Sequence, residues 1–151
     1  TIGSFLAEHT LATIQGEAVM WYRNPPDLSQ APRYLRHLGS PSPGQGTAWK
    51  IGHWSPYDKD KRVGDMGGDN IRYDPGVLLE IPFYRAPRFC IHWRLTWVNP
   101  DLVRAEVRVS WQRPSTEREK YSSCPVKMVH DVGSVGSVTL PALVMRNVHV
   151  Q

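Results

Sequence analysis

The sequence predicts an all-β protein, and two observations lead to that prediction. The 151-residue chain contains 13 prolines and 12 glycines, a frequency of breakers that favours short strands joined by loops over a helical bundle. Residues 88–114 read RFCIHWRLTWVNPDLVRAEVRVSWQRP, and apolar and polar side chains alternate along this stretch with one interruption. The length suits one core, so we expect residues 1–151 to form a single domain.

The N-terminal part shows mixed periodicity. We interpret residues 1–17 as an extended N-terminal arm, followed by a strand near residues 18–22.

Residues 25–40, PPDLSQAPRYLRHLGS, favour a helix. Ser29 is a capping residue, Pro32 falls in the first turn where proline is tolerated, and Gly39 supplies the stop. One face of this helix would carry Leu28, Leu35 and Leu38.

The middle of the chain alternates between loop and strand signals. Residues 41–46 read as a loop and residues 47–54 as a strand. Residues 55–75 are polar, charged and rich in glycine, and we expect a long surface loop there. Residues 77–84 are apolar enough for a buried strand or a short helix.

Two strands of about nine residues are expected within residues 88–114. The apolar side chains of each share one phase: Phe89, Ile91, Trp93, Leu95 and Trp97 in the first, and Val103, Ala105, Val107, Val109 and Trp111 in the second. The opposite phase carries polar residues. Each strand should therefore bury one face and supply a large part of the core.

Two weaker signals follow. Thr116 and Glu119 form a weak capping box, which indicates one or two helical turns after Pro114. Residues 137–146 read as a strand in which Pro141 indicates an edge position or a bulge.

Charge and cysteine content bear on the setting of the protein. The net charge is +4 and the pI about 9.3, which suits a nearby polyanion without resembling a dedicated nucleic-acid arm. Cys90 and Cys124 are unclustered, so we expect a reducing compartment and no disulfide framework. No signal peptide and no membrane span are predicted, and the chain is expected to be made in a cytoplasm.

No catalytic, metal or cofactor site is predicted. The acidic residues Asp58, Asp60, Asp65 and Asp69 lack the spacing of an EF-hand, and Cys90, His92, His130 and His149 lack zinc-ligand spacing. No nucleophile elbow or phosphate-binding loop is present. We therefore expect a protein that is not an enzyme.

Arginines dominate the polar phase of the two strands. Arg94, Arg104 and Arg108 are the candidate contacts for RNA phosphates or for a neighbouring subunit, with Glu106 interrupting them. Six tryptophans also leave open a stand-alone β-sandwich module that binds carbohydrate or a protein partner through exposed indole rings.

Three stretches, read in order, resemble capsid proteins of picorna-like viruses, nearest to the dicistrovirus and iflavirus kind. FCIHWRLTWVNPDLVRAEVRVSWQRP resembles the paired strands D and E of that family, VKMVHDVGSVGSVTLPALV resembles the following segment with strand F, and TIGSFLAEHTL resembles the segment ahead of the first strand. Gln151 resembles a polyprotein cleavage position. The Asp-Asp-Phe sequence of that family's maturation chemistry does not occur here.

The resemblance implies a jelly-roll β-sandwich of two antiparallel sheets, of which this chain would hold strands B to F and one or two short helices. Strands D and E would lie in opposite sheets, joined by a corner at Asn99-Pro100-Asp101, and the arginines would point out of two different sheet faces. The implied function is a structural subunit of an icosahedral virion shell around RNA. Its partners would be other capsid subunits, a separate chain supplying the remaining strands, and, secondarily, genomic RNA, with no membrane.

Overall fold

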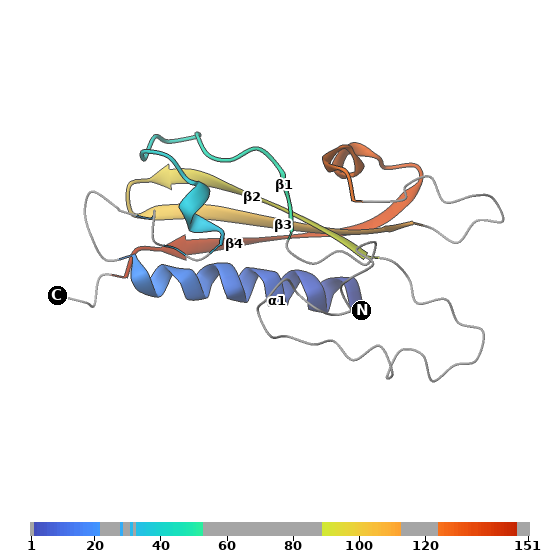
Figure 1. The fold of residues 1–151 in the computed structure, drawn as a ribbon, viewed down its shortest axis with the longest axis horizontal. Coiled ribbons are helices and arrows are strands. Elements are labelled where there is room, and N and C mark those ends of the chain that lie inside the picture. Colours follow the sequence, from blue (N-terminus) through green and yellow to red (C-terminus); the bar gives the residue numbers. More distant parts are fainter. Residues whose placement is uncertain are drawn as a thin grey trace.

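The computed structural model describes residues 2–21, 28, 31, 33–52, 89–112 and 124–147. In these residues four strands form one antiparallel sheet in the order β1-β2-β3-β4, and the long helix α1 lies across one of its faces (Figure 1). The prediction of a mainly β protein is confirmed. The helix was not predicted.

The two alternating segments form the centre of the sheet. β2 (Phe89–Asn99) and β3 (Leu102–Gln112) pair directly along their length, from Phe89 opposite Trp111 to Trp97 opposite Val103. β4 (Val135–Met145) pairs with β3, and β1 (Lys50–Ile51) pairs with β2. The apolar phases of β2 and β3 therefore point to the same face of one sheet.

The interruption between the two strands is a hairpin turn. The backbone N–H of Asp101 donates to Oδ1 of Asn99 at 2.8 Å, a bond that favours a tight turn. Pairing continues up to Asn99 opposite Leu102, so the two turn residues Pro100 and Asp101 reverse the chain within one sheet. The expectation that residues 89–97 and 103–111 lie in opposite sheets with a corner between them is wrong.

Helix α1 (Ile2–Glu17) covers the inner face of β3 and β4. Its buried side chains recur every three or four residues, the spacing of one helix face: Leu6, Ala7, Thr10, Leu11, Ile14 and Glu17. The predicted extended arm over residues 1–17 is therefore wrong, and so is the strand near residue 18, since Ala18–Met20 form a 3₁₀ turn. Thr10 and Glu17 are polar but buried, so the apolar residues of the sequence alone do not show the helical period.

A second segment covers the inner face of β2. It contains the 3₁₀ turn η2 (Leu35–His37), next to which the ring of Tyr34 meets that of Trp93 edge-on at 4.9 Å. The α-helix predicted for residues 25–40 is wrong for residues 33–40, because the backbone N–H groups of Tyr34 and Leu35 bond the Glu17 carboxylate instead of helical carbonyls. The three leucines expected on one face of that helix are all buried: Leu28, Leu35 and Leu38.

The remaining expectations have mixed outcomes. The strand predicted at residues 47–54 is confirmed only as β1, and the strand predicted at residues 137–146 is confirmed as β4. The long loop at residues 55–75, the segment 77–84 and the turns near residue 119 lie outside the described residues.

Candidate interaction surface

We call the sheet face opposite α1 the outer face. It is formed by the even positions of β2 and β3 and, by register, the odd positions of β4. On the inner face the odd positions of β2 and β3 belong to the core with α1. The outer face has three parts along the strands: a charged middle, an apolar end next to the hairpin turn, and a covered end.

The three candidate arginines meet on the charged middle of the outer face. Arg94 lies opposite Glu106 and donates to it through Nε and Nη2 at 2.9 and 3.1 Å, while Arg104 approaches the same carboxylate at 3.4 Å. Arg108 donates to the Thr139 hydroxyl at 3.3 Å. The expectation that these arginines point out of different sheet faces is wrong, because direct pairing of β2 and β3 puts all even positions on one side.

Trp49 also belongs to this surface, and sequence reasoning missed it. The guanidinium of Arg94 lies 4.6 Å from the centre of the Trp49 ring, a cation–π contact that orients the arginine. Trp49 directly precedes β1, so only the position of β1 beside β2 brings the two residues together. The local sequence around Trp49 carried no signal for this pair.

Next to the hairpin turn, three aliphatic side chains form an apolar patch across two strands. The outer apolar patch consists of Leu102, Leu143 and Met145, and the exposed Val98 lies at the register shift of β2 between Trp97 and Asn99. Leu102 pairs with Met145 and Arg104 pairs with Leu143, so the patch borders the charged middle. Leu143 is 56% and Met145 67% exposed, unusually high values for large apolar residues in a strand that contributes to a core.

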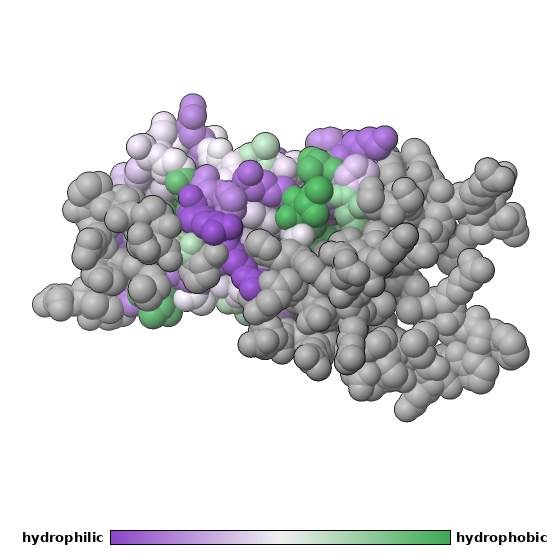
Figure 2. All heavy atoms as spheres, in the orientation of Figure 1, coloured by the Kyte–Doolittle hydropathy of each residue, from purple (hydrophilic) through white to green (hydrophobic). Residues whose placement is uncertain are grey.

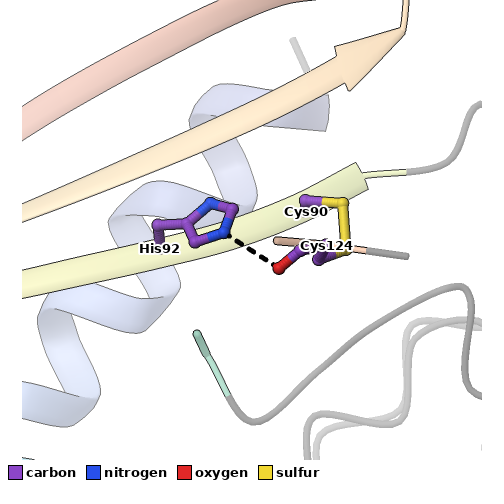
Figure 3. The surroundings of a disulfide bond; sticks show 3 residues. All are labelled: Cys90, His92 and Cys124. Carbon is purple, nitrogen blue, oxygen red and sulfur yellow. Dashed lines mark hydrogen bonds between the residues drawn. A yellow bond between two sulfur atoms is a disulfide. The ribbon is translucent and has the colours of Figure 1, made fainter. Parts of the chain in front are cut away.

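At the far end a segment folds over the outer face. Residues 124–130, which we call the cap, include the 3₁₀ turn η3 (Val126–His130), and a disulfide joins Cys124 of the cap to Cys90 of β2 (Figure 3). Met128 and Val135 complete a small cluster around the disulfide. The expectation of two reduced cysteines is wrong: the fold places their Cα atoms 5.5 Å apart, within bonding range.

His92 is fully buried beneath the cap. Its Nε2 donates to the carbonyl oxygen of Cys124 at 3.2 Å, which leaves Nδ1 as the basic nitrogen, and Nδ1 has no hydrogen-bond partner among the described residues (Figure 3). Burial lowers the pKa of His92. Hydrogen bonding to the cap backbone raises this pKa in part, and the positive charge of Arg108 lowers it again. Both cysteine sulfurs are in the disulfide, so His92 lies beside no free thiol in the described part of the chain.

Among the described residues β4 is an edge strand, and its outer edge is blocked over its second half. The backbone N–H of Arg146 donates to the carbonyl oxygen of Asp101. In an antiparallel pair, the backbone N–H and C=O groups at even positions of β4 therefore point toward β3, and those at odd positions point toward the edge. At the edge, Pro141 has no N–H, and the Leu143 carbonyl accepts a bond from the Gln15 side chain at 3.3 Å. Pairing with another strand is therefore disfavoured beside the outer apolar patch.

Other chemistry has little support in the part of the chain that the structure describes. There, no three His, Cys, Asp or Glu side chains gather as metal ligands, and no helix is long and apolar enough to cross a membrane. The acidic positions 58–69 and His149 lie outside the described residues. The described tryptophans are buried or half-buried, so none offers the open indole platform of a sugar-binding site.

Comparisons with protein-family models, curated proteins and solved structures found no match to this chain. Its function must therefore be argued from the outer face itself.

Proposed function

We propose that this chain is a structural subunit that assembles with copies of itself through the outer face of its sheet. The observation that carries the proposal is the outer apolar patch. Exposed aliphatic side chains such as Leu143 and Met145, next to the half-buried Leu102 and bordered by arginines, are typical of protein contact surfaces. Water-exposed leucine and methionine cost free energy that burial against a partner recovers, at about 25 cal/mol per Å² of apolar surface.

The charged middle supports a contact that needs a defined register. Glu106 accepts two hydrogen bonds from Arg94, which also lies over the Trp49 ring, so the remaining donors of Arg94 point in set directions before a partner arrives. Ordered charges of this kind reduce the entropy lost on docking. The arrangement favours recognition of a protein surface over catalysis, since among the described residues no free thiol lies beside the buried His92.

The disulfide supports a place of action outside a reducing cytoplasm. Disulfides persist in secreted proteins, at cell surfaces and in virions, and are rare in the cytosol. We therefore propose that the assembly forms or matures in an oxidising setting.

A virion shell around RNA, built on a jelly roll, is the finer form of this proposal. The sequence resemblance supports it, while the direct pairing of β2 with β3 removes the strand D and E assignment from that support. Electron microscopy of the assembled protein tests it: closed particles that retain RNA would support a shell, and open arrays or small oligomers without RNA would contradict it.

The proposal that the chain assembles is tested by substitution in the patch. Leu143→Asp and Met145→Asp should abolish the rise of mass with concentration that light scattering is expected to detect for the wild-type protein. Ser137→Asp is the matched control, because Ser137 is exposed on the same strand and face but outside the patch. A wild-type protein that stays monomeric at every concentration would contradict the proposed function.

A further inference from the structure

The two faces of the molecule differ in charge. Three arginines and one glutamate line the outer face, so its charged middle is net positive by two. On the opposite side, α1 contains no lysine or arginine. Among the side chains of α1 and the following turn whose burial is described, the exposed ones are Phe5, Glu8, Ala12, Gln15 and Val19, with Gly16 between them. This second surface, the exposed α1 face, is therefore apolar and carries one negative charge.

We propose that the outer face of one copy docks on the exposed α1 face of the next copy, so that copies stack head to tail. This inference rests on the proposed function and names the partner of its site. The outer apolar patch would meet Phe5 and Val19, which are 49% and 63% exposed, and the arginines would meet Glu8.

Charge favours this arrangement over a symmetric pair of outer faces. A twofold dimer would set two net-positive surfaces against each other, and like charges across an interface are costly. The exposed α1 face offers a carboxylate and apolar side chains without a lysine or arginine of its own. The blocked edge around Pro141 and Leu143 also disfavours association by strand pairing at that end of the sheet.

The position of the two surfaces lets the contact repeat from copy to copy. Helix α1 and the outer face lie on opposite sides of the sheet, so the two surfaces of one copy cannot contact each other (Figure 1). A head-to-tail contact leaves one surface unused at each end, and repeated contacts then build a ring or a filament. Figure 2 shows a hydrophobic area on this side of the molecule, between the hydrophilic areas over η2 and over η3.

Charge reversal tests the contact. Glu8→Arg and Arg104→Glu should each weaken self-association by about tenfold or more in sedimentation velocity at low salt, because each places like charges in the interface. An equimolar mixture of the two variants should assemble again, since the two reversed positions then face each other with opposite charges. The double variant in one chain should also assemble. Arg36→Glu, an exposed reversal outside both surfaces, is the control.

The outcomes separate this inference from the proposed function. If Leu143→Asp blocks assembly but Glu8→Arg leaves it unchanged, the outer face binds another surface and the head-to-tail inference is overturned. If each reversal weakens assembly and neither the mixture nor the double variant restores it, the paired contact is also overturned. Recovery in both supports the stacking of α1 on the outer face.

Discussion

The indole ring of Trp111 lies directly against the backbone of Gly136. A Cβ atom at position 136 would stand 2.5 Å from Nε1 and 2.6 Å from Cε2 of that ring, closer than such atoms approach in proteins. From the other side, a Cβ at Gly3 of α1 would lie 2.9 Å from Cζ3 of the same ring. Trp111 therefore fills the space between helix and sheet because two glycines leave room for it.

Gly136→Ala should destabilise the protein by about 1–3 kcal/mol, because the added methyl group displaces a large packed ring. Urea unfolding followed by tryptophan fluorescence measures the loss. Gly16→Ala is the matched control: no atom of the described residues lies within 4 Å of its Cβ position, so alanine in the helix should stabilise by up to about 1 kcal/mol. Equal effects of the two substitutions would contradict this account of Trp111.

Glu17 should be important for the segment that covers β2. Its carboxylate is buried and accepts bonds from the backbone N–H groups of Tyr34 and Leu35 at 3.0–3.1 Å. Glu17→Ala removes the acceptor of these bonds and should cost about 2–4 kcal/mol in the free energy of unfolding. Glu17→Gln retains one acceptor oxygen and should cost less. The prediction fails if both variants unfold at the wild-type urea midpoint.

The disulfide should account for a large part of the stability. Cys90 and Cys124 are 34 positions apart, and a closed loop of that size corresponds to about 3–4 kcal/mol in the chain-entropy description. The double substitution Cys90→Ser with Cys124→Ser, or reduction with dithiothreitol, should lower the unfolding midpoint accordingly. Reductant should have no further effect on the double variant; a further drop would point to a different cause.

Stability should fall as the solution becomes acidic, partly through His92. Burial depresses its pKa in the folded protein below the ordinary value of 6.5. Between the folded pKa and 6.5 the unfolded chain binds more protons, so this contribution is complete above pH 6.5 and is lost as the pH falls toward the folded value. His92→Gln keeps a donor for Cys124 and should reduce the loss of unfolding free energy as the pH falls below 6.5. His130→Gln, at an exposed site, should leave that loss as it is in the wild-type protein.

The strands of this protein were predictable because their signal is local. The alternation in residues 88–114 indicated both strands of the hairpin, the Asn99-Pro100-Asp101 break indicated where they separate, and Pro141 indicated the edge position of β4. Each of these features depends on neighbouring residues and on the side-chain period of a strand.

Contacts between distant segments decided the rest. Helix α1 buries the charged Glu17 because Tyr34 and Leu35 donate their backbone N–H groups to it, a relation that no local pattern expresses. Likewise, the pairing of β2 with β3 brought Arg94, Arg104 and Arg108 onto one face, and the folding of the cap over β2 brought Cys90 to Cys124. The sequence by itself determined which residues alternate; the tertiary structure decided which alternating faces share a sheet, because register and pairing are set across the chain and not along it.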